Sequence, residues 1–283
     1  MLMKSYLRRW FSVGYSYFFV GWLYLSTVYR FWRWRVQLWL HPSHYEESTQ
    51  TGMKQTLLII RHGQSTWNAE QLLPGQLPGI PLNDTGREQA ARLADALSAL
   101  PIQVIVSSPL ERAKETADII VQGRELTVQL EPDLMDTNIG PWAGKNYNEL
   151  GKIDPAWPAY VKDPTVAPEG IETFPQVQQR SVAAVDRWLA REPGAAYIAF
   201  VAHADVVKLL IAHYSGLEAG RAGIMLIENA SVSIVELDSE HLHHVRIVAI
   251  GWNPRPGWLK PPELKPEPEP ASEAAKEMEA TES

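Results

Sequence analysis

The chain has 283 residues, a formal net charge of −7 and 45% apolar residues, which is typical of a globular domain with appendages. A wholly disordered chain, a collagen-like repeat and a multi-span membrane protein are excluded. The acidic balance also argues against nucleic acid as the main partner, because phosphate backbones attract a basic surface. The sequence contains no cysteine, so disulfide frameworks, zinc knuckles, thiol nucleophiles and iron–sulfur clusters are excluded. Catalysis must therefore depend on His, Ser, Thr, carboxylates, Lys or Arg.

Charge and aromatic content divide the chain into three segments. Residues 1–52 carry a net charge of +4 and five of the eleven Trp residues, residues 53–258 carry −7, and residues 259–283 carry −4. The last segment interleaves Pro with Glu and shows no apolar periodicity with which to bury surface. We predict a catalytic domain over residues 53–258 and a disordered tail over residues 259–283.

Residues 1–52 form an aromatic and basic extension that is compatible with three interpretations. Residues 10–29 are uncharged and long enough to cross a bilayer, although aromatic residues, Ser and Gly dilute the run. The extension is a single membrane anchor, a segment upstream of a natural start at Met53, or a packed accessory element. Because no small-residue cleavage motif follows, we do not expect a removable signal peptide. We expect a cytoplasmic catalytic domain, with membrane contact through residues 10–29 as the alternative.

From Met53 onward, short apolar runs alternate with helical patterns. Strands are predicted over residues 56–60, 104–106 and 197–201. Helices are predicted after a cap at Asn83 or Asp84, around Arg112, and over residues 177–189 and 204–214. Residues 231–237 and 244–250 indicate a hairpin at the sheet edge. This alternation predicts an α/β fold, a three-layer α/β/α sandwich with a mostly parallel sheet.

Polar side chains follow each of the three predicted buried strands. Arg61 and His62 follow the first, Arg112 lies one turn beyond the second, and His203 follows the third. Ligands in such sheets bind beyond the carboxyl ends of the strands, so these side chains are expected to converge. Paired arginines bind phosphate or carboxylate groups, and a histidine can attack phosphorus. The sequence therefore predicts phosphoryl chemistry at this edge of the sheet.

Several blocks of the sequence resemble the histidine phosphatase superfamily, the phosphoglycerate mutase-like proteins. RHGQSTWN at residues 61–68 is similar to the RHG signature of that family. PGIPLNDTG at 78–86, SSPLERA at 107–113, the loop around Asp136 and VAHAD at 201–205 follow in the family's order. The ordered blocks span about 200 residues, a normal domain length, and are more specific than an isolated RHG.

The resemblance implies roles for five residues of the predicted site. His62 attacks phosphorus and becomes phosphohistidine. Arg61, Arg112 and His203 bind the phosphate oxygens, because phosphoryl transfer needs alignment and charge stabilisation. Asn68 adds a hydrogen bond, or serves instead as a helix cap. The family requires no metal, and no cofactor is expected.

The general acid is the point at which this sequence departs from the family. The family often has a glutamate in the loop where this chain has Asp136, which is one methylene shorter. Protonation of the leaving alcohol by a positioned carboxylic acid typically contributes about 10²–10⁴-fold. Asp136 is the preferred donor, with Asp205 and Glu172 as alternatives.

The sequence thus favours a metal-independent phosphatase acting on small phosphorylated metabolites. One alternative is a cofactor-dependent phosphoglycerate mutase-type phosphotransferase, although its basic cluster for a bisphosphate is not evident between Asp136 and His203. Another is a non-catalytic phospholigand-binding module, which would not need His62 as a nucleophile.

A group of three histidines and a pair of tryptophans are each explained more simply by structure than by function. Three histidines cluster at the predicted hairpin turn without nearby acids, which favours a solvated turn over a metal site; they are His241, His243 and His244. Trp142 and Trp157 line the substrate mouth or pack in the core. Packing is favoured, since Trp is usually largely buried.

Overall fold

The computed structural model describes residues 54–238 and 245–254, all of which belong to the unit Gly52–Ser283. The predictions for residues 1–52, for the tail at 259–283 and for the turn histidines His241, His243 and His244 lie outside the described residues. Within the described ranges, none of the helices combines the length and the apolar character that a membrane crossing requires.

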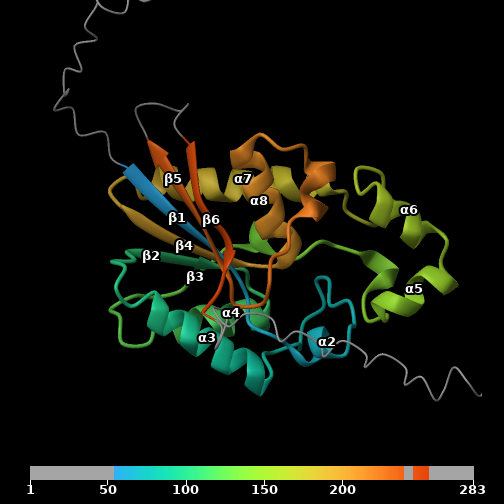
Figure 1. The fold of residues 1–283 in the computed structure, drawn as a ribbon, viewed down its shortest axis with the longest axis horizontal. Helices are drawn as coiled ribbons and strands as arrows, with labels where there is room; N and C mark the ends of the chain where they lie inside the picture. The colour runs from blue at the N-terminus through green and yellow to red at the C-terminus, as the bar shows by residue number, and fades with distance from the viewer. Residues whose placement is uncertain (1–53, 239–244, 255–283) are drawn as a thin grey trace, which may run out of the picture. The chain divides into compact units, whose positions relative to one another are not determined.

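A six-stranded sheet with the order β3-β2-β4-β1-β5-β6 forms the centre of the domain (Figure 1). Four neighbouring strands run parallel, and the hairpin β5–β6 pairs antiparallel beside β1 with β6 at the edge. The strands are β1 (Lys54–Arg61), β2 (Val104–Ser107), β3 (Gln129–Leu130), β4 (Tyr197–Ala202), β5 (Val232–Asp238) and β6 (Val245–Trp252). The mostly parallel sheet and its edge hairpin are confirmed; β3 was not predicted, because two residues show no periodicity.

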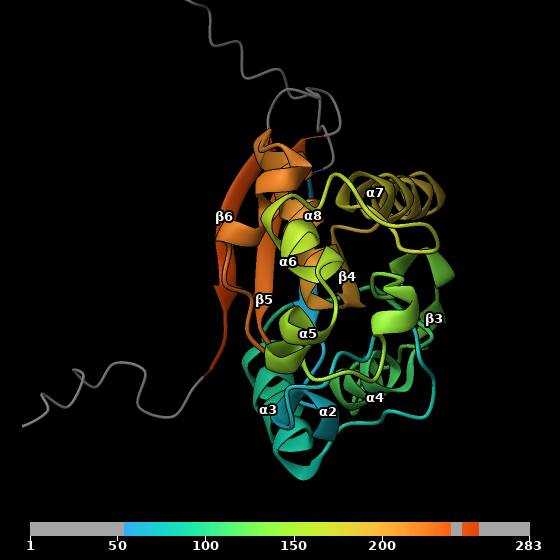
Figure 2. The same cartoon turned by 90° about the vertical axis from the view of Figure 1, so that its right-hand side faces the viewer.

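Helices cover both faces of this sheet, as Figures 1 and 2 show. One face packs on α3 (Asp84–Ala96) and α4 (Glu111–Ile120), and the other on α7 (Phe174–Arg191) and α8 (Ala204–Ser215). Within β1, Leu58 and Ile60 belong to the core with α3 and α4, whereas Leu57 and Ile59 belong to the core with α7 and α8. Successive strand side chains point to opposite faces, so a two-sided core requires the continuous apolar run seen in the sequence. The three-layer α/β/α fold is confirmed.

Caps fix where the main helices begin. The Asn83 side chain accepts a hydrogen bond from the Gly86 N–H (2.8 Å), so Asn83 is the cap of α3 and Asp84 is its first acidic residue. Helix α7 begins with a capping box between Thr173 and Gln176. These caps satisfy N–H groups that have no partner inside the helix.

Short helices occupy the segment between β3 and α7: the 3₁₀ turns Pro132–Leu134 and Gly140–Trp142, α5 (Tyr147–Ile153) and α6 (Ala156–Lys162). Trp142 and Trp157 are 1% and 7% exposed, with ring centroids 5.1 Å apart in an edge-to-face arrangement. The Trp142 Nε1–H donates to the Asp154 carboxylate at 2.7 Å. The packing interpretation of both tryptophans is confirmed.

We predict that residues 1–52 are dispensable for folding. Strand β1 begins at Lys54 and pairs on one side with β4 and on the other with β5. A chain beginning at Met53 should unfold cooperatively, with a thermal midpoint close to that of the full chain. A chain beginning at Ile59 is the matched control, and it should not fold because five of the eight residues of β1 are missing. Aggregation of the first chain, or a loss of more than about tenfold in kcat/KM (about 1.4 kcal/mol), would contradict this boundary.

Candidate active site

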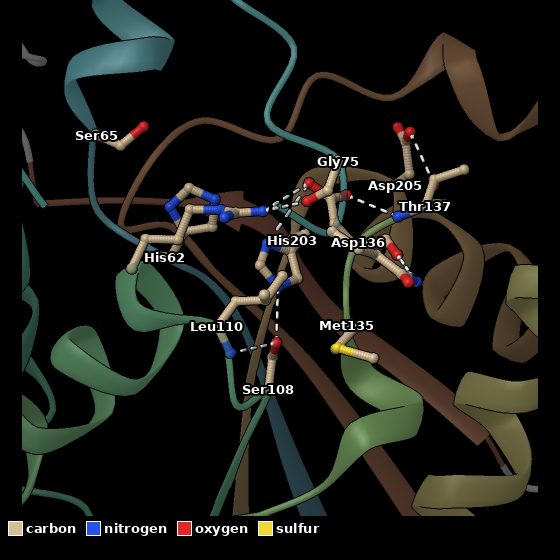
Figure 3. Close-up of polar contacts among 12 residues, drawn as sticks. His62, Ser65, Gly75, Ser108, Leu110, Met135, Asp136, Thr137, His203 and Asp205 are labelled. Atoms are coloured by element: carbon tan, nitrogen blue, oxygen red, sulfur yellow. Dashed lines mark hydrogen bonds and ion pairs between the residues drawn. The ribbon is translucent and has the colours of Figure 1, made fainter. Parts of the chain in front are cut away.

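The predicted site residues follow the carboxyl ends of three neighbouring strands, and they lie at the same edge of the sheet. His62 follows β1, His203 follows β4 and begins α8, and Ser108 and Arg112 follow β2, with Arg112 in the first turn of α4. His62 is 2% exposed, and His203 and Arg112 are fully buried. The two imidazole centroids lie 5.1 Å apart. The convergence of these residues is therefore present in the structure, and Figure 3 shows His62, Ser108 and His203 lying together.

The loop after β1 is held tightly against the beginning of α3. A Cβ at Gly63 would collide with the carbonyl oxygen of Gly86, and a Cβ at Gly86 would collide with the backbone of Gln64. The Gly63 N–H donates to Thr116 Oγ1 at 3.0 Å and the Gln64 N–H donates to Gln89 Oε1 at 2.9 Å. Residues far from the RHG block, namely Gly86, Gln89 and Thr116, thus contact the loop after β1 and fix the position of His62.

The contacts of the His62 ring make it a neutral base with its lone pair on Nε2. Its Nδ1 lies 2.6 Å from the Gly63 carbonyl oxygen. A carbonyl only accepts, so Nδ1 carries the proton and Nε2 carries the lone pair. Burial, and then the charges of Arg112 and Arg61, hold the pKa of His62 well below its ordinary value. The imidazole is therefore neutral at pH 7.

His203 and the two arginines present further N–H donors near this histidine. Arg112 donates through Nη2 to the Gly75 carbonyl (2.7 Å), and Arg61 donates through Nη1 to the Ile227 carbonyl (2.6 Å). His203 Nε2 lies 2.9 Å from Ser108 Oγ. In the tautomer in which the Ser108 hydroxyl donates this hydrogen bond, Nε2 is the acceptor and the ring proton is on Nδ1. Burial and Arg112 lower the pKa of His203.

Several of these donors are buried without a hydrogen-bond partner among the described residues. They are Nε of Arg61, Nε and Nη1 of Arg112, and Nδ1 of His203. Buried polar groups are normally satisfied, and each exception calls for an explanation such as an absent ion or ligand. Guanidinium and imidazole N–H groups gathered in this way suit an anion with several oxygens.

Asp136 lies beside these donors. Its Oδ2 is 3.2 Å from Arg112 Nη2 and 3.7 Å from His203 Nδ1, and its Oδ1 accepts from the Thr137 N–H at 3.0 Å (Figure 3). Burial is the main cause that raises the pKa of Asp136, with Asp205 adding to it and Arg112 opposing it. A raised pKa extends the range in which this carboxyl group holds a proton.

The two alternative carboxylates have other contacts. Asp205 lies 3.4 Å from Thr137 Oγ1 and 3.4 Å from Lys208 Nζ. Glu172 forms a two-pronged ion pair with Arg180, at 2.8 and 2.9 Å. Of the three carboxylates, Asp136 is the one in contact with both Arg112 and His203.

Asn68 makes the contacts of a helix cap. It lies in α2 (Thr66–Ala69), where its Oδ1 accepts from the Ser65 N–H at 3.1 Å and Ser65 Oγ accepts from the Asn68 N–H at 3.2 Å. Asn229 also donates to Asn68 Oδ1 (3.3 Å) and to the His62 carbonyl (3.2 Å). The sequence did not single out Asn229, because nothing in its local pattern links it to residues more than 160 positions away.

The described residues contain no cluster of three or more His, Asp or Glu side chains suited to a metal ion. The donors gathered at the site are cationic or neutral N–H groups with one carboxyl group, a set that matches an anionic ligand more closely than a cation.

The sequence model of the histidine phosphatase superfamily (branch 1) matches residues 57–250. The match covers the whole described sheet apart from its ends, and includes both histidines and both arginines of the site. This chain therefore belongs to the histidine phosphatase superfamily and is an enzyme of the phosphatase and phosphoglycerate mutase-like type.

Individual relatives agree with this assignment. The chain is 34% identical over 186 residues to the phosphoglycerate mutase-like protein 4 of Arabidopsis thaliana, covering 64% of this chain and 79% of the relative. It is 29% identical over 190 residues to the adenosylcobalamin/alpha-ribazole phosphatase of Escherichia coli (65% and 91%). A solved mycobacterial glucosyl-3-phosphoglycerate phosphatase complexed with VO3 is 31% identical, with a TM-score of 0.60 (64% and 92%).

Proposed function

We propose that this protein is a metal-independent phosphatase that hydrolyses small phosphomonoesters through a phosphohistidine on His62. The observation that carries the proposal is a set of buried N–H groups on Arg61, Arg112 and His203 that have no hydrogen-bond partner among the described residues, close to a neutral His62. Such a set supplies what phosphoryl transfer requires, namely alignment of the nucleophile and stabilisation of charge on the phosphate oxygens.

In the proposed first step, His62 Nε2 attacks phosphorus while the bond to the ester oxygen breaks. Arg61, Arg112 and His203 hold the phosphoryl oxygens, and Asp136 gives its proton to the leaving oxygen. In the second step a water molecule attacks phosphorus, the bond between phosphorus and His62 Nε2 breaks with its electron pair returning to Nε2, and Asp136 takes up the water proton. Inorganic phosphate leaves, and His62 returns to its neutral state.

The choice between hydrolysis and a mutase-type transfer is tested with a panel of phosphorylated metabolites, assayed with and without a bisphosphoglycerate primer. We expect inorganic phosphate to be released without a primer and in the presence of a metal chelator. Phosphate transfer that depends on the primer would favour the mutase. Loss of activity in chelator, restored by a divalent cation, would contradict metal independence.

Replacing Asp136 by Asn should impair only those reactions that need a proton donor. We expect a loss of about 10²-fold in kcat/KM on alkyl phosphates, and a much smaller loss on p-nitrophenyl phosphate, whose phenolate leaves without help. Asp205→Asn is the matched control, since it removes a neighbouring carboxylate that does not contact Arg112. Equal losses on both substrates would refute Asp136 as the proton donor.

The pH dependence of the same variant provides a second test. Asp136 must be protonated in the first step, so activity on alkyl phosphates should fall as pH rises through its raised pKa. His62 must be neutral, so activity should fall on the acidic side only below its lowered pKa. Asp136→Asn should therefore lose the alkaline limb of the pH profile and keep the acidic limb.

A further inference from the structure

The guanidinium group of Arg180 holds the loop that carries Asp136. Arg180 lies on α7, and its side chain is 17% exposed. Nη1 donates to the carbonyls of Asp133 and Met135, both at 2.7 Å, and Nη2 donates to the carbonyl of Asp136 at 2.8 Å. One side chain thus binds three backbone carbonyls within four residues of the chain.

Glu172 adds hydrogen bonds to the backbone on the C-terminal side of Asp136. Its Oε1 accepts from Arg180 Nε (2.8 Å), and its Oε2 accepts from Arg180 Nη2 (2.9 Å) and from the Asn138 N–H (2.7 Å). The Glu172 N–H donates in turn to the Asn138 carbonyl at 2.8 Å. The Arg180–Glu172 ion pair therefore binds the backbone up to and including Asp136 on one side, and at Asn138, two residues further on, on the other.

We propose that Arg180, paired with Glu172, is a positioning residue for the proton donor Asp136; this inference rests on the proposed function above. An aspartate has only two side-chain torsions, so the place of its carboxyl group follows the backbone closely. The Thr137 N–H that binds Asp136 Oδ1 belongs to the same held segment. Small misplacements of a reacting group cost large factors in rate.

The fixed fork of an arginine is well suited to this task. Its planar guanidinium presents N–H donors in several fixed directions, and Arg180 uses all three nitrogens here. A lysine at this position would keep the positive charge, but its single nitrogen could not bind the three carbonyls and both carboxylate oxygens together. Geometry, rather than charge alone, is therefore what the site requires from Arg180.

The experiment compares Arg180→Met and Arg180→Lys with the wild-type chain on an alkyl phosphate and on p-nitrophenyl phosphate. We expect both variants to lose about tenfold or more in kcat/KM on the alkyl phosphate, where the proton donor is needed. The loss on p-nitrophenyl phosphate should be less than about threefold, because attack by His62 is unaffected. In both variants, the fall in activity on the alkyl phosphate at high pH, which reports the proton of Asp136, should also become less pronounced.

Arg187→Met is the matched control. Arg187 lies two turns further along α7 and forms ion pairs with Glu131 (3.0 Å) and Asp133 (2.6 Å), with its side chain 52% exposed. It thus contacts the same loop through carboxylates rather than through the carbonyls at Met135 and Asp136. This variant should change the ratio of the two activities by less than about twofold, since exposed ion pairs contribute little.

A double variant separates positioning from a general loss of structure. If Arg180 acts through Asp136, then Arg180→Met should cost almost nothing on the alkyl phosphate once Asp136→Asn is present. An additive loss in the double variant, or equal losses on both substrates in Arg180→Met, would overturn the inference. If Arg180→Met does not fold, Arg180→Lys decides by the same comparison.

The proposed function has a separate readout in these experiments. Phosphohistidine trapped on the Arg180 variants during p-nitrophenyl phosphate turnover would show that the chemistry of His62 stands, whatever the result for Arg180. Its absence from the wild-type chain would overturn the proposed function instead.

Discussion

Replacing His62 by Ala is expected to abolish phosphatase turnover while leaving the fold intact. The wild-type imidazole is neutral, with its Nδ1 proton directed to the Gly63 carbonyl and its Nε2 free for attack on phosphorus. Alanine has no nucleophile, and removal of the group that forms a covalent intermediate typically costs at least about 10⁴-fold in kcat. Steady-state assays with an alkyl phosphate and with p-nitrophenyl phosphate should both show this loss.

The covalent intermediate itself provides the sharper measurement. Wild-type enzyme quenched during turnover should carry phosphate that is acid-labile and base-stable, and His62→Ala should carry none. His213→Ala is the control, because His213 is an exposed histidine on α8 outside the site. Phosphate found on a serine, or activity that survives His62→Ala, would contradict the mechanism.

Arg112→Met should remove phosphate binding without unfolding the protein. Arg112 is fully buried, its Nε and Nη1 have no partner among the described residues, and burial lowers its pKa. An incompletely paired buried charge contributes little to stability, and an apolar side chain of similar length can replace it. Because that charge is needed at the transition state, kcat/KM should fall by about 10³-fold or more.

A thermal shift separates binding from catalysis in this variant. Inorganic phosphate should raise the unfolding midpoint of the wild-type protein, since a ligand at 100 times its Kd stabilises by about 2.7 kcal/mol. Arg112→Met should show no such shift. Arg124→Met is the control; Arg124 binds the Leu97 and Leu100 carbonyls beyond α3, so this variant should lose stability but keep the shift. A phosphate-dependent shift that persists in Arg112→Met would refute the assigned anion site.

The layered fold was predictable because its signals are local. A continuous apolar run such as residues 57–60 indicates a strand buried on both faces, and Asn83 marks a helix start through its own side chain. Ligands bind beyond the carboxyl ends of parallel strands, and this alone predicted that His62, Arg112 and His203 lie close together. Strand β3 and the short helices α5 and α6 were missed, because segments of two to seven residues show too little periodicity.

The sequence by itself determined the class of chemistry, since the types of residue that follow the buried strands are a property of the chain order. The roles of Asp136, Glu172 and Arg180 depended on the tertiary structure. The sequence offered Glu172 as a proton donor and assigned no role to Arg180. Folding pairs the two and joins them to the backbone around Asp136. Such contacts cross from α7 to a loop about 45 positions away, a distance at which local pattern carries no information about which polar groups meet.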